Sequence, residues 1–362
     1  KGEVAIAHNG NLTNTEELKH KLFMEGSIFQ TTSDTELFLH LISRSLQTNF
    51  RDALVETLGT VQGAYSLTIL HDDILYAVRD PWGFRPLYIG FKDDMTVIAS
   101  ETCALDILNV TDYRSMLPGE VVRIDEQGLQ SFILPRPETH QQCIFEMIYF
   151  ARPDSKVFDY SVHVQRKLMG RALAEADAQL HAEAIPGNDI VVPVPDSGTS
   201  SAIGYAEASG IPFDMGLTRN HYTGRSFIMP TKGEREMVVK MKLHPVREVV
   251  QGKRVFLVDD SLVRGTTARL LVKLLRDAGA REVHLRLTAP EIRWPCFFGI
   301  DIPTRSELIS NTYTPEQVAV ELATGRVAAD DPSMGVPEIN AAVRKLHEPY
   351  TPQEMERYAA VC

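Results

Sequence analysis

Two short, uninterrupted runs of apolar residues in the second half of the chain predict buried β-strands. They are Val-Phe-Leu-Val at 255–258 and the apolar run within 189–195. Runs that are apolar on both faces are typical of parallel sheets. A pattern with helical period follows each run, at 268–278 and 202–208, and a longer one covers 161–184. The second half is therefore predicted to fold as an α/β domain.

The first half has a different pattern, in which two early helices precede a series of short strands. Asn14 with Glu17, and Ser33 with Glu36, have the spacing of capping boxes, and apolar residues at helical spacing follow both pairs. This mixture of elements indicates an α+β sandwich. The strands are predicted at 4–7, 63–70, 74–78, 97–101 and 120–124, the second and third forming a hairpin.

A polar, proline-rich stretch at 134–140 separates the two patterns and predicts a linker or a crossover. A length of 362 residues is enough for two domains. We therefore expect a first domain at 1–142, a second at 143–327 and a C-terminal segment at 328–362.

Composition argues against several classes of protein. The chain has 37 Lys and Arg against 48 Asp and Glu, whereas nucleic-acid binders normally have a basic surface. No apolar run reaches the length of a membrane span, and no secretory signal is visible. Four scattered cysteines do not form a disulfide framework, so we expect a reducing cytoplasm. Because the chain opens at Lys1 rather than at a methionine, we expect it to be a fragment.

The strand at 255–258 leads into Asp259, Asp260 and a Gly-Thr-Thr turn before a helix. The backbone N–H groups and the dipole at such a helix start suit a phosphate. Two acids beside a phosphate fit a ligand that also carries ribose hydroxyls or a divalent cation. The pattern thus indicates a phosphorylated sugar, with Mg²⁺. The alternative is a surface turn whose acids cap the helix.

A second loop of small residues, 196–201, follows the other predicted strand. Two such loops at the ends of separate strands favour a diphosphate ligand, although either alone is also compatible with an ordinary βα turn. Between the loops, residues 219–247 hold seven Lys or Arg and two Asp or Glu. A basic run is usually a solvated face. We interpret this one as a basic loop that closes over the ligand and excludes water.

The segment 258–267 resembles the signature of type I phosphoribosyltransferases, which bind phosphoribosyl pyrophosphate (PRPP). The resemblance implies a Rossmann-like fold, with Asp259 and Asp260 holding the ribose hydroxyls directly or through Mg²⁺. It also implies that the remaining PRPP contacts come from the two loops and the basic segment: Asp196, Ser197, Gly198, Thr199, Arg225, Lys240, Ser261, Arg264, Gly265, Thr266 and Thr267.

Two features of the first half have both a structural and a functional interpretation. Asn9-Gly10 is a turn signal, but an amide and a free N–H at that point also suit an oxyanion. Asp34 lies where a helix would begin and would ordinarily compensate the helix dipole.

Three motifs in order, at 8–11, 33–36 and 79–87, resemble the glutaminase domain of class II amidotransferases, which have an N-terminal nucleophile. By that resemblance Asn9 and Gly10 form the oxyanion hole, and Asp34 binds the α-amino group of glutamine. The fold implied is an Ntn-hydrolase-type α+β domain. The family's nucleophile is an N-terminal cysteine. No cysteine matches it here, so we expect the chain as given to use ammonia at best.

Both halves together, from residue 1 to about 311, resemble glutamine–PRPP amidotransferases, and the segments 152–155 and 225–230 set them apart from nucleobase-salvage enzymes. The implied reaction converts glutamine, PRPP and water to 5-phosphoribosylamine, glutamate and pyrophosphate, the first committed step of purine synthesis. We expect small-molecule substrates, no nucleic-acid or membrane partner, and a homo-oligomer. The rivals are a nucleobase-salvage phosphoribosyltransferase and a non-enzymatic PRPP-binding regulator.

Some members of that family hold a [4Fe–4S] cluster on four cysteines. Cys143 and Cys296 match two of the ligand positions, and Cys362 is a candidate for a third. Residues 328–362 do not resemble the region of the later ligands. Cys103 is predicted to be a buried structural thiol.

Overall fold

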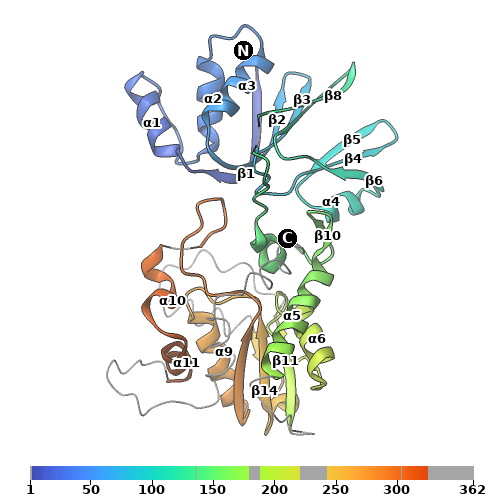
Figure 1. The fold of residues 1–362 in the computed structure, drawn as a ribbon, viewed down its shortest axis with the longest axis vertical. Helices are drawn as coiled ribbons and strands as arrows, with labels where there is room; N and C mark the ends of the chain where they lie inside the picture. Colours follow the sequence, from blue (N-terminus) through green and yellow to red (C-terminus); the bar gives the residue numbers. More distant parts are fainter. Residues whose placement is uncertain (1, 136, 179–187, 221–242, 303, 325–362) are drawn as a thin grey trace. The chain divides into compact units, whose positions relative to one another are not determined.

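The computed structural model describes residues 2–135, 137–178, 188–220, 243–302 and 304–324, and it divides into two compact units (Figure 1). Unit 1 comprises Lys1–Glu146, Asp154–Ser161 and Cys296–Asp301. Unit 2 comprises Met147–Pro153, Val162–Pro295 and Ile302–Cys362. Three short stretches of the predicted second domain, 143–146, 154–161 and 296–301, therefore belong to unit 1, which the sequence pattern did not indicate.

Unit 1 is built on a five-stranded antiparallel sheet in the order β1-β2-β3-β7-β8. A smaller antiparallel sheet has the order β5-β4-β6. The strands are β1 (Val4–Leu12), β2 (Gly63–His71), β3 (Ile74–Arg79), β4 (Tyr88–Lys92), β5 (Met95–Ala99), β6 (Asp112–Ser115), β7 (Glu120–Asp125), β8 (Gly128–Ile133), β9 (Lys156–Val157) and β10 (Tyr160–Ser161). The helices are α1 (Thr15–Met24), α2 (Thr35–Arg44), α3 (Phe50–Thr60) and α4 (Thr102–Ile107).

Both faces of the larger sheet of unit 1 are covered, because side chains alternate along each strand. Tyr76 and Val78 of β3 face the core formed with α1, α2 and α3, which includes Phe38. Ala77, between them, packs instead with Ile89 of the smaller sheet. The predicted α+β sandwich is confirmed.

The first strand is longer than predicted. Asn9 and Gly10 lie inside β1 rather than in a turn, opposite Ser66 and Tyr65 of β2. The turn prediction was wrong because the pairing with β2 continues along the whole of β1 and overrides the local preference of Asn-Gly.

Neither predicted capping box forms. The Asn14 side chain accepts from the N–H of Gln62 at 3.0 Å and donates to the carbonyl of Thr60 at 3.1 Å, so it joins α1 to the start of β2. Glu36 accepts from the N–H groups of Gln30 and Thr31, each at 2.8 Å. In both cases a side chain of the predicted capping box forms its hydrogen bonds with backbone groups outside the helix instead.

Unit 2 has a parallel sheet in the order β11-β14-β15, made of β11 (Asp189–Pro193), β14 (Arg254–Asp259) and β15 (Glu282–Leu287). Its principal helices are α5 (Val162–Ala178), α6 (Thr199–Ser209) and α9 (Thr266–Asp277). The smaller elements are a π-helical turn (Glu146–Phe150), whose first residue belongs to unit 1, and β12 (Leu217–Arg219), β13 (Leu243–Pro245), α8 (Arg247–Val250), a 3-10 turn (Arg305–Glu307), α10 (Ile309–Thr312) and α11 (Pro315–Thr324).

Helices cover both faces of the parallel sheet. Val255 and Leu257 of β14 pack in one core with Leu271 of α9, while Phe256 and Val258 pack in another with residues of α5 and α6. These four strand residues are at most 5% exposed, as the uninterrupted apolar run predicted. The α/β expectation for the second half is confirmed.

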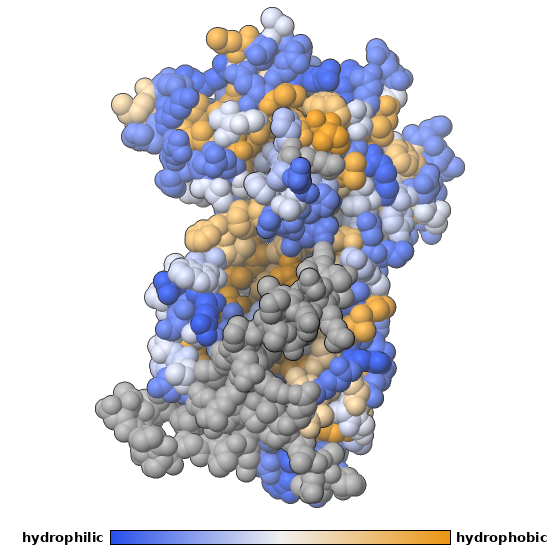
Figure 2. Space-filling model, viewed as in Figure 1, coloured by the Kyte–Doolittle hydropathy of each residue, from blue (hydrophilic) through white to orange (hydrophobic). Residues whose placement is uncertain are grey.

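Polar and charged residues cover much of the face shown in Figure 2, and apolar side chains are exposed between them in patches. Among the helices in the described ranges, none has the length and apolar character that crossing a membrane requires.

His284 of β15 predicts a loss of stability in mild acid. Burial lowers the pKa of this histidine to about 4. The contact between its Nε2 and Oε2 of Glu282, at 3.1 Å, acts in the opposite direction and is outweighed. An unfolded histidine has a pKa of about 6.5, so between pH 6.5 and 4 the unfolded chain binds more protons and stability falls as pH falls. About 3 kcal/mol should be lost across this window.

The measurement is urea unfolding at several pH values, with His284→Phe for comparison. The phenylalanine does not titrate, and it keeps a ring at this position. In the unaltered protein the His284 ring stacks on Phe256 with ring centroids 5.2 Å apart. The pH slope should shrink in the variant. An equal slope in both proteins would assign the acid sensitivity to other groups.

Candidate functional site

Asp259 ends β14, and Asp260 follows it at the carboxyl edge of the parallel sheet. The N–H groups of Thr288 and Ala289 donate to the carbonyls of Asp259 and Asp260 at 3.2 and 2.7 Å. The Asp259 carboxylate accepts from the N–H of Asp260 at 2.9 Å and from the hydroxyl of Ser197 at 3.4 Å. The structure thus holds two consecutive carboxyl groups in a fixed backbone frame.

The electrostatics of this pair favour a cation. Burial and then the charge of Asp260 raise the pKa of Asp259 well above its ordinary value. Burial and the same two carboxylates raise the pKa of Tyr149, a neighbour that sequence reasoning missed and for which no motif gave a signal. A bound cation would relieve this clustering of negative charge.

The donor set suits Mg²⁺ shared with a substrate. No group of three or more His, Cys, Asp or Glu in the described part of the chain is arranged to hold a metal ion by itself. Mg²⁺ is commonly held by one or two carboxylates together with substrate phosphates and water. Asp259 and Asp260 meet that requirement.

The loop after the acid pair ends at Gly265, which precedes α9. Its φ of 74° is in the left-handed region, and a Cβ there would lie 2.5 Å from Cδ1 of Ile309. Glycine is therefore required for the turn that presents the N-terminus of α9. Thr266 and Thr267 are exposed in the first turn of α9, as a phosphate site needs. Arg264 forms an ion pair with Glu307 at 2.8 Å.

The second small-residue loop follows β11, which is the neighbour of β14 in the sheet. The hydroxyl of Ser197 reaches Asp259, and a Cβ on Gly198 would lie 2.4 Å from the carbonyl of Val258, so the two loops are in contact. Arg219 forms an ion pair with Asp196. The structure thus brings the two predicted phosphate loops together with one arginine of the basic segment. Arg225 and Lys240 lie outside the described residues.

In unit 1, Asp34 faces β1 rather than its own helix. Its carboxylate makes no capping bond to α2; it accepts from the N–H of Leu12 at 2.9 Å and lies 3.4 Å from Nδ1 of His8. Burial raises the pKa of Asp34, but the hydrogen bonds from His8 and Leu12 outweigh it, and the pKa is lowered overall. An ionised carboxylate at this position suits an ammonium group.

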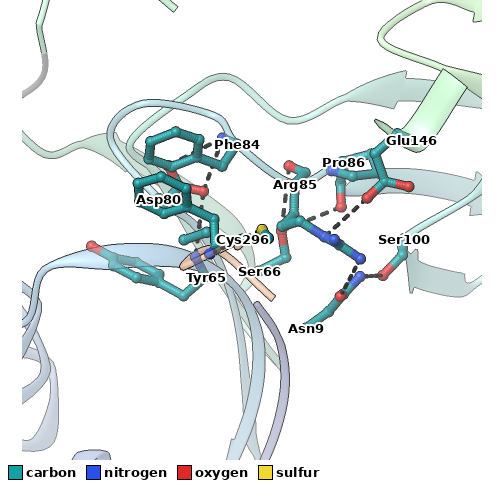
Figure 3. A network of polar contacts seen from close by, with 12 residues as sticks. Asn9, Tyr65, Ser66, Asp80, Phe84, Arg85, Pro86, Ser100, Glu146 and Cys296 are labelled. Atoms are coloured by element: carbon teal, nitrogen blue, oxygen red, sulfur yellow. Dashed lines mark hydrogen bonds and ion pairs between the residues drawn. The ribbon is translucent and has the colours of Figure 1, made fainter. Parts of the chain in front are cut away.

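Asn9 belongs to a network of polar contacts (Figure 3). Its Oδ1 accepts from Arg85 at 3.0 Å, and its Nδ2 donates to the hydroxyl of Ser100 at 3.1 Å. Arg85 also pairs with Glu146 at 2.9 Å. Sequence reasoning placed Arg85 in a family motif without a role and gave no role to Ser100 or Glu146, because their contacts join distant parts of the sequence.

The segment Cys296–Asp301 packs against the same region of unit 1. Asn11 donates to the carbonyl of Phe297 at 3.0 Å, and Phe298 stacks on Phe84 with ring centroids 4.2 Å apart. Gly299 has a φ of 103°, and a Cβ there would lie 2.7 Å from the carbonyl carbon of Gly10. The segment therefore supports the end of β1 where Gly10 lies.

The three described cysteines are free and partly exposed. Cys103 is thus not fully buried as predicted; it lies in the short helix α4 at the surface of unit 1. Burial, and then the charge of Glu146, raise the pKa of Cys143, which favours the thiol over the thiolate. Cys362 and the segment 328–362 lie outside the described residues.

Comparison with known proteins finds two domains and close relatives. A family described as a glutamine amidotransferase domain matches residues 1–107, and one described as a phosphoribosyl transferase domain matches residues 164–289. The amidophosphoribosyltransferase of Methanocaldococcus jannaschii is 44% identical over 334 residues, covering 88% of this chain and 69% of its own. That of Bacillus subtilis is 47% identical over 321 residues, covering 89% and 66%.

One relative and one solved structure align with nearly the whole chain. Amidophosphoribosyltransferase 3 of Arabidopsis thaliana is 44% identical, covering 100% of this chain, its C-terminal segment included, and 65% of its own. The structure of the glutamine PRPP amidotransferase from B. subtilis, complexed with ADP and GMP, superposes with a TM-score of 0.81 at 42% identity, covering 98% of this chain and 75% of its own. The chain spans between 65% and 69% of the length of these three curated relatives. It belongs to the amidophosphoribosyltransferase family.

Proposed function

We propose that the protein transfers the amide nitrogen of glutamine to PRPP. Glutamine, PRPP and water give 5-phosphoribosylamine, glutamate and pyrophosphate. The observation that carries the proposal is the contact between the two loops of unit 2, which brings the acid pair beside a second phosphate loop. One ligand with a ribose, a phosphate and a diphosphate matches all of these groups.

In unit 2, catalysis is electrostatic and positional. Asp259 and Asp260 accept from the ribose hydroxyls or hold Mg²⁺, which when bound neutralises charge on the leaving pyrophosphate. The backbone at 261–267 binds the 5-phosphate at the start of α9. The loop at 196–199, with Arg219, binds the pyrophosphate. These contacts fix C1 of the ribose for attack by ammonia.

In unit 1, the proposed site hydrolyses the side-chain amide of glutamine. The ionised Asp34 carboxylate binds the α-ammonium group of glutamine, which its lowered pKa supports. The Asn9 amide and the Gly10 N–H donate to the oxyanion that would form when the thiolate of the family's N-terminal cysteine adds to the amide carbon; ammonia then leaves, and water releases glutamate from the thioester.

A [4Fe–4S] cluster does not fit the described residues. Such a cluster takes four thiolates, whereas of the candidate ligands only Cys143 and Cys296 lie in the described part of the chain, where no three His, Cys, Asp or Glu are grouped to hold a metal. A homo-oligomeric state and a cytoplasmic location stay predictions.

The test supplies PRPP and Mg²⁺ with ammonium, glutamine or free nucleobases and follows the release of pyrophosphate. For the chain as given we expect release with ammonium only, and none with glutamine or with a base, because no cysteine in it matches the family's nucleophile. Turnover with a base but not with ammonium would identify a salvage enzyme. Binding of PRPP without release under any condition would identify a regulator.

A further inference from the structure

An asparagine in an oxyanion hole works only if its amide faces the right way. The NH₂ group must point toward the substrate, because the carbonyl end would repel an oxyanion. The two ends of the amide have similar shape, so hydrogen bonds determine which end faces the site. The contacts of Asn9 therefore bear directly on its proposed role.

In this fold Arg85 determines the orientation of the Asn9 amide. A guanidinium group has five N–H donors and no acceptor, so the group facing it must be the carbonyl Oδ1, which accepts at 3.0 Å. A flipped amide would place its NH₂ against the guanidinium, two donors facing each other. Ser100 then accepts one N–H of Nδ2 at 3.1 Å, and the second N–H is available to a ligand.

Arg85 is itself held firmly. Its side chain is 0% exposed, and its Nε lies 2.9 Å from Oε1 of Glu146, which is 1% exposed (Figure 3). The main-chain carbonyl of Arg85 accepts from Nε of the buried Arg79 at 2.9 Å. Burial raises the pKa of Glu146 to about 7, so this carboxyl is not fully ionised at neutral pH; the complete burial of the Arg85 side chain together with the close contact limits its movement away from Asn9.

We propose that Arg85, fixed by Glu146, is a positioning residue that orients the Asn9 amide for oxyanion stabilisation. The positive charge next to Oδ1 also polarises the amide and strengthens its N–H groups as donors. The inference rests on the proposed glutaminase function of unit 1. It adds a buried pair, Arg85 and Glu146, that acts through Asn9.

The test is a double-mutant cycle in the full gene product, with glutamine-dependent and ammonium-dependent pyrophosphate release measured side by side. Asn9→Ala should lower the kcat for glutamine by about 10²- to 10³-fold, the effect of losing one oxyanion donor. Arg85→Met should lower it by about 10²-fold with the KM for glutamine little changed, because the contact matters in the transition state. Ammonium-dependent release should be unchanged in both variants.

The decisive comparison is Arg85→Met in the Asn9→Ala background, where it should add less than about a twofold effect. A full additional loss there would show that Arg85 does not act through Asn9 and would overturn the inference. If Asn9→Ala itself leaves glutamine-dependent turnover intact, the proposed oxyanion hole fails, and the inference with it.

Two further variants keep the result interpretable. Arg114→Met removes another arginine of unit 1, which pairs with Glu120 at 2.7 and 2.8 Å and does not contact Asn9, so turnover should be unchanged. If Arg85→Met does not fold, Arg85→Lys carries the same cycle. Lysine keeps a cation beside Glu146 but lacks the fork that reaches Asn9 as well.

Discussion

Replacing Asp259 or Asp260 by asparagine should lower ammonium-dependent pyrophosphate release by about 10³-fold, corresponding to several kcal/mol of lost charge stabilisation. Asparagine keeps the volume of the side chain but removes the negative charge that would hold Mg²⁺ or accept strongly from the ribose hydroxyls. The measurement is kcat/KM for PRPP at saturating ammonium. Asp277→Asn, an exposed carboxylate at the other end of α9, is the matched control.

Stability separates this effect from misfolding. Because the pKa of Asp259 is raised in the folded protein, the folded state binds more protons than the unfolded one above the ordinary pKa, and stability falls as pH rises through that range. An asparagine at position 259 carries no charge, so it removes the free-energy cost of holding an ionised carboxylate there in the folded protein. At neutral pH and without Mg²⁺ or PRPP, Asp259→Asn should therefore unfold at the same temperature as the unaltered protein, or higher. A variant that is inactive but also markedly less stable would undermine the assignment.

Gly299→Ala should lower glutamine-dependent turnover by about 10²-fold while sparing the ammonium-dependent reaction. A Cβ at this position would lie 2.7 Å from the Gly10 carbonyl carbon and 2.8 Å from its carbonyl oxygen, so the backbone of Gly10 and that of Gly299 must move apart. A displacement of about 1 Å at an oxyanion donor is enough for a loss of this size.

Steady-state kinetics with each nitrogen source would measure the effect of Gly299→Ala, and Gly252→Ala supplies the control. Gly252 also has a positive φ, of 72°, but a Cβ there meets nothing within 4 Å. It therefore reports the backbone strain alone. Equal losses with glutamine in the two variants would show that the contact with Gly10 does not matter.

Local patterns in the sequence predicted the parallel strands and the loops that follow them. The apolar run at 255–258 predicts a strand buried on both faces, as observed. The glycine of the Gly-Thr-Thr turn suits the positive φ that Gly265 adopts before the helix. Both signals lie within about ten residues of each other. The acid pair and the helix start could therefore be predicted together, before any tertiary contact was known.

The glutaminase-side geometry depends on contacts that no local pattern encodes. Asn9 contacts Arg85 across 76 positions of sequence, and Asn11 contacts Phe297 across 286. Asn9-Gly10 looked like a turn because its strand partner is determined more than fifty residues later. For the same reason Asp34 looked like a helix-capping acid, although its carboxylate binds the N–H of Leu12.

Isotope transfer shows whether nitrogen moves from glutamine to the ribose of PRPP. The full gene product is supplied with PRPP, Mg²⁺ and glutamine labelled with ¹⁵N in its amide, and the products are followed by ¹⁵N and ³¹P spectroscopy. We predict ¹⁵N bonded to C1 of ribose 5-phosphate, formed together with one equivalent of pyrophosphate. Label that stays in glutamine, or appears as free ammonia while PRPP remains intact, would show that the protein does not transfer the amide nitrogen to PRPP.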